Sequence, residues 1–279
     1  MDTATNYPFK VGALKCIAIN DGTNTSSPER LVTDVPTEQL NQALLECGYS
    51  PSEIISYYNC LYIQTGRHRI LVDAGWGKGT QRRDGALLDH LKAEGIGPTD
   101  ISMVIITHGD FDHVGGITTS EDQLTFPKAD YILSKDGWDF WSNAETLAQL
   151  PEHLTVFGRK MLPLIRSRLK VVGPGVEFLP GFQLIPAPGH RPGHTAVHIS
   201  SSGKYLLHLA DTVGHPILME HPSWHSPFDT QPDQAEKDKR QLLSQAVAQK
   251  ALVFGSHFPF PGVGRITPHA EGWRWQPLA

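Results

Sequence analysis

Five apolar runs of this chain, each of a length that predicts a buried strand, are followed within a few residues by Asp or His. The most crowded case is the segment THGDFDHVGG at residues 107–116, which comes straight after the apolar run ISMVII at 101–106. A short continuous apolar run is typical of a strand that is covered on both faces. Side chains at strand ends are held by a rigid sheet while they face a cleft, so the pattern predicts a functional site at these strand ends.

The residue types at these strand ends are those that bind metal ions. They are Asp73, His108, Asp110, Asp112, His113, His190, His194, Asp211 and His257. Aspartates packed against one another in one loop repel and lose solvation, which raises their pKa values. A divalent cation removes that cost, and histidine is the commonest metal-ligating side chain. The pattern therefore predicts a metal site, and the alternative is that these groups cap turns and pair across loops.

The composition limits the partners that this protein is expected to bind. The chain has 279 residues, and we expect one domain over residues 1–279. A net charge of −5 and a pI near 6.3 argue against nucleic acid or a membrane as partner. No signal peptide and no apolar run of the ~18–20 residues that span a bilayer are visible. The three cysteines, Cys16, Cys47 and Cys60, are far apart, so we expect free thiols and a cytoplasmic location.

The spacing of apolar residues predicts two groups of strands, each followed by helices. Strands are expected within residues 13–22, 59–75, 101–106, 129–134, 175–190, 195–211 and 251–258. Helices are expected within residues 33–49, 84–96 and 231–250, with Thr37 as an N-cap and turns at Gly22 and Gly66. Two sheets packed face to face with helices outside would form an α/β protein, an αββα four-layer sandwich of two mixed β-sheets.

Five segments, in order, resemble the motifs of the metallo-β-lactamase-fold hydrolases. THGDFDHVGG resembles the HxHxDH signature, with Asp110 at the second histidine position. ILVDAG resembles the early strand-end aspartate motif, and PGHRPGHT resembles the PGHTxGH motif. LLHLADT resembles the strand that carries the bridging aspartate, and GSHFPFPGVG the segment of the last ligand. The segments lie within residues 70–264, and the resemblance implies the αββα fold for most of the chain.

The resemblance implies two metal sites joined by a bridging aspartate. The expected ligands are His108, Asp110 and His194 at the first site, Asp112, His113 and His257 at the second, and Asp211 as the bridge. Asp112 is also the expected catalytic residue, because it would orient the bridging hydroxide. The carboxylate of Asp110 hardens the first site, so the expected cofactors are two divalent ions, zinc or else manganese or iron. The alternative for Asp110 is that it turns away and leaves the first site weak.

The layout is most similar to the lactonase and organophosphate-hydrolase branch of the superfamily, for example at GSHFPFPGVGRI around the last ligand. This similarity implies a dinuclear hydrolase that attacks a small ester or lactone with a metal-bridging hydroxide. The alternatives are a phosphotriesterase or phosphodiesterase of the same fold, and a low-turnover effector that binds a ligand. The expected partner is a small-molecule substrate, and a homodimer is left open. Acyl-homoserine lactonases carry a tyrosine three residues after the bridging aspartate, where this chain has Gly214.

Other residues near these segments are candidates for the pocket wall and for support of the ligands. The candidate substrate contacts are Trp76, His215, Trp224, His225 and Phe260. The residues expected to support the ligands are Asp73, His190 and His208. An aromatic wall fits a short apolar or aromatic ester, and core packing is the alternative role for each aromatic residue.

Overall fold

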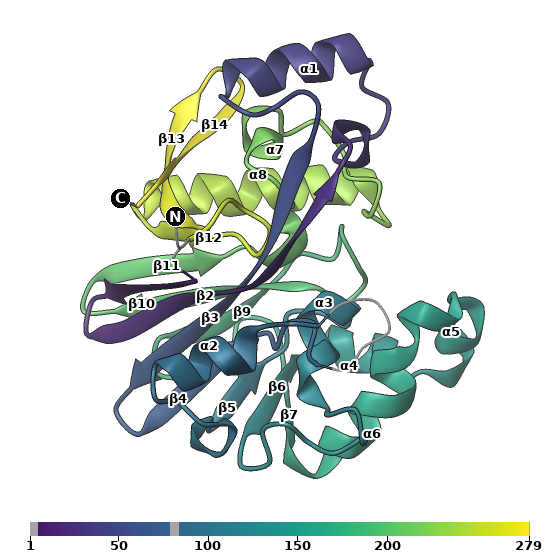
Figure 1. Cartoon of the computed structure of the whole chain (residues 1–279), viewed down its shortest axis with the longest axis vertical. Helices are drawn as coiled ribbons and strands as arrows, with labels where there is room; N and C mark the ends of the chain where they lie inside the picture. Colours follow the sequence, from purple (N-terminus) through teal and green to yellow (C-terminus); the bar gives the residue numbers. More distant parts are fainter. Residues whose placement is uncertain (1–4, 79–83, 279) are drawn as a thin grey trace.

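Two seven-stranded sheets form the centre of the protein, whose computed structural model describes residues 5–78 and 84–278 (Figure 1). The first sheet contains, in spatial order, β1 (Asn6–Val11), β2 (Leu14–Ser26), β3 (Ile54–Thr65), β4 (His68–Val72), β5 (Met103–Ile105), β6 (Asp130–Ser134) and β7 (Leu169–Val172). The second contains β14 (Gly272–Pro277), β13 (Val263–His269), β12 (Leu252–Phe254), β11 (Lys204–His208), β10 (Thr195–Ser201), β9 (Phe182–Pro186) and β8 (Glu177–Leu179). Parallel pairs join β4 through β7 and also join β11 to β12, so both sheets are mixed, as predicted.

Helices cover the outer face of each sheet (Figure 1). Along the first sheet lie α2 (Leu87–Ala93), α4 (Lys135–Trp141), α5 (Ala144–Gln149) and α6 (Leu162–Ile165). Along the second lie α1 (Thr37–Glu46), α7 (Ile217–Glu220) and α8 (Pro232–Ala248). The remaining helix, α3 (Phe111–Val114), is a single turn at the end of β5. Short 3₁₀ turns cover Pro28–Arg30, Pro98–Asp100, Gly115–Ile117, Glu152–Leu154, Arg166–Arg168 and Ala210–Thr212, and a π turn covers Phe157–Met161.

Three apolar clusters separate the layers. Trp141 of α4 belongs to the cluster between the first sheet and its helices, and Leu243 of α8 belongs to the equivalent cluster on the second sheet. A third cluster joins the sheets themselves, with Ile63 from one side and Val197 and Leu206 from the other, all fully buried. Helix, sheet, sheet and helix thus form four layers, and the predicted αββα sandwich is confirmed. That residues 1–279 form a single domain stays a prediction.

Most predicted elements are present with shifted ends. The turn at Gly66 joins β3 to β4, and the predicted helices correspond to α1, α2 and α8. The strand expected to end at Gly22 instead continues as β2 to Ser26, because a register shift between Asn20 and Thr23 carries it past the turn sequence. At α1, Pro36 occupies the N-cap and Thr37 is already helical, which differs from the prediction.

Two further predictions concern disulfide bonds and membrane-spanning helices. Cys16, Cys47 and Cys60 are free thiols, in agreement with the expected absence of a disulfide. Among residues 5–78 and 84–278, no helix combines the length and the apolar character that crossing a membrane requires.

Candidate metal centre

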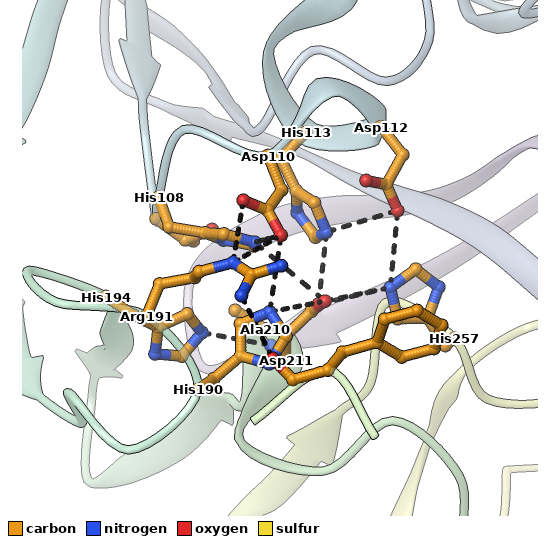
Figure 2. A network of polar contacts seen from close by, with 12 residues as sticks. His108, Asp110, Asp112, His113, His190, Arg191, His194, Ala210, Asp211 and His257 are labelled. Carbon is orange, nitrogen blue, oxygen red and sulfur yellow. Dashed lines mark hydrogen bonds and ion pairs between the residues drawn. The ribbon is translucent and has the colours of Figure 1, made fainter. Parts of the chain in front are cut away.

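Seven Asp and His side chains from four loops converge at the ends of the strands (Figure 2). The loop after β5 and α3 supply His108, Asp110, Asp112 and His113, the loop between β9 and β10 supplies His190, the turn after β11 supplies Asp211, and the loop after β12 supplies His257. Three groups place their ligand atoms within 4.8 Å of one another: His108–Asp110–His190, His108–His113–Asp211 and Asp112–His113–His257. We call the first of these groups the first triad and the last the second triad.

Asp211 lies between the two triads and contacts both. Its Oδ2 atom is 3.9 Å from His108 Nε2 and 3.5 Å from His190 Nε2. Its Oδ1 atom is 3.0 Å from His113 Nε2 and 3.1 Å from His257 Nε2. Two ligands bound ~2.0–2.1 Å from one tetrahedral zinc ion are roughly 3.3 Å apart. These separations are therefore those expected of atoms that share metal ions.

Asp73, at the end of β4, orients two of the histidines. Its Oδ2 atom accepts a hydrogen bond from His113 Nδ1 at 2.8 Å. The same oxygen accepts from the Thr107 hydroxyl at 2.8 Å, and that hydroxyl lies 3.0 Å from His108 Nδ1. The Nδ1 atom of each ring therefore lies within this chain of contacts, and each Nε2 atom faces the cluster. The prediction that Asp73 supports the ligands agrees with this geometry.

The other two histidines of the cluster are oriented in the same way. His190 Nδ1 lies 3.1 Å from Asp229 Oδ1. His257 Nδ1 donates to the carbonyl oxygen of Tyr57 at 2.9 Å. In both rings the remaining nitrogen, Nε2, points at Asp211 (Figure 2). A carboxylate or backbone carbonyl behind a histidine is the usual arrangement that fixes a metal ligand.

The atoms that face the cluster lack hydrogen-bond partners among the described residues. The Nε2 atoms of His108, His113 and His190 and the Oδ1 atom of Asp211 are buried and form no hydrogen bond, although His113 Nε2 and Asp211 Oδ1 lie within ion-pair distance at 3.0 Å. A buried polar atom without a hydrogen bond costs about 1–3 kcal/mol. Imidazole nitrogens and carboxylate oxygens crowded together in this way are stabilised by a positive charge between them. The donor set, imidazole nitrogens and carboxylate oxygens, fits divalent metal ions.

The pKa values of the cluster residues depend on two influences, burial and the charges of neighbouring side chains. Burial lowers the pKa of His108 far below its usual value, and the neighbouring His113 adds to this effect. Burial also opposes a charge on His113, but Asp211, Asp112 and Asp73 outweigh it and hold the pKa well above normal. Burial raises the pKa of Asp112, while His113 and His257 partly offset the rise.

The structure differs from the expected first site at one histidine. His194 was expected to be the ligand, and His190 was expected to support it. His194 instead donates from Nδ1 to the carbonyl oxygen of Ala187 at 2.9 Å and accepts from the Asp211 backbone N–H through Nε2 at 3.1 Å. Both ring nitrogens are therefore occupied inside the protein. Burial lowers the pKa of His194 to about 3, which keeps the ring neutral and able to accept.

His194 and His208 together hold the turn that carries Asp211. The backbone N–H of Ala210 donates to His208 Nδ1 at 3.2 Å, next to the bond between Asp211 N–H and His194. Ala210 has a φ of 46°, a strained value for a residue with a side chain. Two imidazole acceptors thus stabilise a turn that the backbone alone disfavours, and the supporting role expected of His208 is compatible with this contact.

Asp110 has a partner that was not expected from the sequence. Arg191 Nε lies 3.0 Å from Asp110 Oδ1 and 2.9 Å from Oδ2 (Figure 2). Burial opposes the charge on Asp110, but contacts with His190 and Arg191 outweigh it and lower the pKa of the carboxyl. Asp110 is therefore ionised, and its carboxylate points toward His108 and His190 rather than turning away. No periodicity or spacing points to Arg191, because the two residues are 81 positions apart.

A pocket of about 440 Å³ opens above the cluster. Its wall contains apolar side chains, of which the main ones are Leu31, Tyr58, Trp76, Phe111, Leu154, Leu218 and Phe228. Its floor contains Asp110, Asp112, His190, Asp211 and His257. Trp76 packs between Tyr58 and Phe111, with ring centroids 5.3 and 5.8 Å away. Among the candidate substrate contacts, Trp76 lies in this wall.

The other four candidate contacts lie outside the pocket wall. His215 is buried against Tyr49, with 4.6 Å between ring centroids. Trp224 is buried and stacks on His221, and His225 pairs with Thr33 through the backbone. Phe260 packs against the core between the sheets. His215 and Trp224 therefore pack inside the protein rather than against the pocket.

Gly214 lines the pocket at the position where acyl-homoserine lactonases carry a tyrosine. A Cβ atom added to Gly214 would meet no heavy atom within 4 Å. The glycine therefore leaves open space beside the cluster rather than avoiding a clash.

Comparisons with known proteins agree with this site. A family model described as the metallo-beta-lactamase superfamily matches residues 56–257, a segment that contains the whole cluster. The probable metallo-hydrolase YqjP of Bacillus subtilis (strain 168) is 29% identical over 178 residues, 57% of this chain and 55% of that protein. This match thus spans just over half of that relative. An N-acyl homoserine lactonase of Bacillus thuringiensis is 24% identical over 220 residues, 71% of this chain and 80% of that protein.

Two solved structures resemble nearly the whole chain. AidC, a dizinc quorum-quenching lactonase solved with a product, N-hexnoyl-L-homoserine, has a TM-score of 0.90 at 29% identity. The hydrolase AbOPH, in the beta lactamase superfamily, has a TM-score of 0.88 at 25% identity. Each comparison covers 100% of this chain and 99% of the other. These relatives are hydrolases, which agrees with the predicted class of enzyme.

Proposed function

Because the chain belongs to the metallo-β-lactamase superfamily and is a metal-dependent hydrolase of that family, we propose that it hydrolyses a small ester or lactone at a centre of two divalent metal ions. One observation carries this proposal. Two triads of Asp and His flank one aspartate on the floor of a pocket whose wall carries both apolar and polar side chains.

The proposed ligands follow the geometry rather than the motif alone. His108, Asp110 and His190 hold the first ion, and Asp112, His113 and His257 hold the second. Asp211 would lie between them, since it contacts His190 of the first triad and both His113 and His257 of the second. His190 replaces His194 in this assignment, because only His190 presents a free Nε2 atom to the cluster.

The roles of the protein side chains follow from their positions. Two divalent ions supply hydroxide at neutral pH by lowering the pKa of bound water toward ~7, and they polarise the bond that is attacked. Asp112 lies on the pocket floor, with Oδ2 3.6 Å from His113 Nε2 and 3.5 Å from His257 Nε2. It is thus placed to orient the attacking water and accept its proton. Asp73 and Asp229 keep the histidine rings in place throughout the reaction.

The pocket supports an apolar acyl or aromatic group as part of the substrate. Trp76, Phe111 and Phe228 offer flat apolar surfaces beside the polar floor. The lactonase relatives act on acyl homoserine lactones by name, which supports lactones as the first class to assay. Zinc is the first metal to load because AidC is a dizinc enzyme, and manganese and iron are the alternatives.

The experiment is to load the purified protein with zinc, manganese or iron and to assay short esters, aliphatic lactones, acyl-homoserine lactones and phosphotriesters. We expect about two ions per chain and turnover of an ester or lactone that a chelator abolishes. Preferential turnover of a phosphotriester would reassign the substrate class within the same site. Two bound ions without turnover of any class would favour the low-turnover effector, and a content of one ion or none would contradict the dinuclear centre.

A further inference from the structure

Asp110 and Arg191 contact each other at the positions where two motifs of this chain depart from the family pattern. Asp110 stands where HxHxDH has its second histidine, and Arg191 stands where PGHTxGH has threonine. The segments are 81 residues apart, yet Arg191 Nε contacts both carboxylate oxygens of Asp110, at 3.0 and 2.9 Å. Two departures that meet in space suggest one functional unit.

The pair is partly buried at the edge of the first triad. The side chain of Arg191 is 14% exposed and that of Asp110 is 13% exposed. Arg191 also donates from a terminal nitrogen to the carbonyl oxygen of Phe228 at 3.1 Å, which fixes the guanidinium against the pocket loop. A charge pair that is mostly shielded from solvent is costly to break from one side, because the remaining charge stays shielded.

The geometry leaves Asp110 able to act as a ligand while it is paired. Its Oδ2 atom lies 3.8 Å from His108 Nε2 and 3.6 Å from His190 Nε2, two atoms without partners. A carboxylate has about four lone-pair sites, and Arg191 uses one on each oxygen. Oδ2 therefore keeps a lone pair for an ion at the first triad.

We propose that Asp110 and Arg191 act together as a neutral replacement for a histidine ligand, in which Asp110 supplies the ligand atom and Arg191 cancels its charge. The inference rests on the proposed dinuclear centre. A lone aspartate would lower the charge of that centre by one unit relative to histidine. The guanidinium, which stays charged at any ordinary pH, restores that unit at contact distance. Arg191 is thus a positioning residue that sets the charge of the centre.

Three variants separate the charge states of the centre. D110H leaves Arg191 unpaired and makes the centre more positive than in the parent. R191T leaves Asp110 unpaired and makes it more negative. The double variant D110H/R191T has the family residues at both positions and returns the centre to the charge of the parent. R191K keeps a positive charge at the position without the planar guanidinium.

The measurements are the rate at which zinc is lost to a chelator and the affinity for acetate. Neither measurement requires a known substrate. We expect D110H to lose zinc roughly tenfold faster or more than the parent, because a unit charge a few ångströms away acts strongly in a buried site. R191T is expected to lose zinc more slowly. Acetate binding, followed as displacement of a reporter anion from the zinc-loaded protein, is expected to be strongest in D110H and weakest in R191T. The double variant and R191K are expected to resemble the parent in both measurements.

A control tests whether any nearby cation has the same effect. Arg30 is exposed and lines the same pocket, and in the described residues it forms no ion pair with Asp110. We expect R30T to leave the zinc loss of D110H unchanged, whereas R191T corrects it. If R30T also slows the zinc loss of D110H, any nearby positive charge has the same effect. The inference that Asp110 and Arg191 act as a pair is then wrong.

The remaining outcomes each decide the inference. If D110H/R191T loses zinc as fast as D110H, Arg191 does not compensate Asp110. If R191T and the double variant are both unstable to heat while R191K is stable, Arg191 acts by holding the loop through Phe228, and the inference is wrong. A parent protein that binds no zinc at all contradicts the proposed function instead, so the two failures are distinguishable.

Discussion

The two triads on either side of Asp211 are built from the same kinds of side chain but are supported by different parts of the fold. In the second triad, Asp112 and His113 lie on the single turn α3, and His113 is held by Asp73 at the end of a neighbouring strand. In the first triad, His190 lies in a long loop and is held by Asp229 in another loop. Asp112 and His113 of the second triad therefore depend on the sheet, whereas Asp110 and His190 of the first depend on contacts between loops.

This difference explains where the chain departs from its family pattern. A ligand fixed by a strand end and its neighbours tolerates few changes, because the sheet fixes the backbone on both sides. Loops tolerate change more readily, provided that new contacts replace the lost ones. Asp110 and Arg191 are such a change: Asp110 belongs to the first triad, and Arg191 follows His190 in the loop between β9 and β10.

Replacement of Asp112 is expected to have the largest effect. In D112N the amide is a poor ligand and cannot accept the proton of the attacking water. We expect turnover of any identified substrate to fall at least about a thousandfold. Steady-state rates on the metal-loaded variant measure this. Activity within tenfold of the parent would place the chemistry elsewhere.

A matched pair of variants tests the two histidines of the PGHRPGH segment. H190A removes a free Nε2 atom from the first triad, so we expect about one ion per chain to remain, bound at the second triad. H194A is expected to keep both ions and to lose stability, because the Asp211 N–H and Ala187 carbonyl lose partners worth about 1–3 kcal/mol each.

Metal content and thermal unfolding of the two proteins measure the difference. The reverse pattern, with the ion lost in H194A and retained in H190A, would restore the assignment that the motif alone implied.

The carboxylates behind the histidines give a smaller and graded test. D73N disturbs His113 directly and His108 through Thr107, whereas D229N disturbs His190 alone. Loss of such a partner typically weakens metal binding about 10–100-fold. We expect D73N to weaken zinc affinity more than D229N, as read by chelator competition. Equal effects would show that the two triads are supported to the same degree.

The smallest expected effect is at the pocket wall. G214Y adds a phenol where an added Cβ meets no atom within 4 Å, so we expect the protein to fold and to keep its metal content. If the substrate is an acyl lactone, a phenol beside the first triad adds a donor for its carbonyl and changes kcat/KM by about tenfold, or ~1.4 kcal/mol. Lactone and ester rates of parent and variant provide the comparison, and an unchanged ratio would show that this position does not contact the substrate.

Much of the fold follows from local patterns, and the exceptions have physical reasons. Alternating and continuous apolar runs predicted β3 to β6 and β8 to β12, because those strands are buried on one or both faces. The edge strands β1, β7 and β14 and the strand β13 beside β14 were not predicted, since their residues carry no clear apolar alternation. β2 was predicted too short because Asp21 accepts backbone hydrogen bonds from Trp76 and Leu87, which stabilises an irregularity in the strand.

The order of apolar runs along the chain predicts which Asp and His residues follow strands, and the family resemblance implies that His108, Asp112, His113, Asp211 and His257 lie together. Each of these residues lies in the segment that follows a strand, so the sheets limit where it can be. The choice between His190 and His194, and the contact of Arg191 with Asp110, follow only from tertiary contacts. The direction of a side chain in a loop depends on which hydrogen-bond partner it meets, and here those partners are 17 to 81 residues away along the chain.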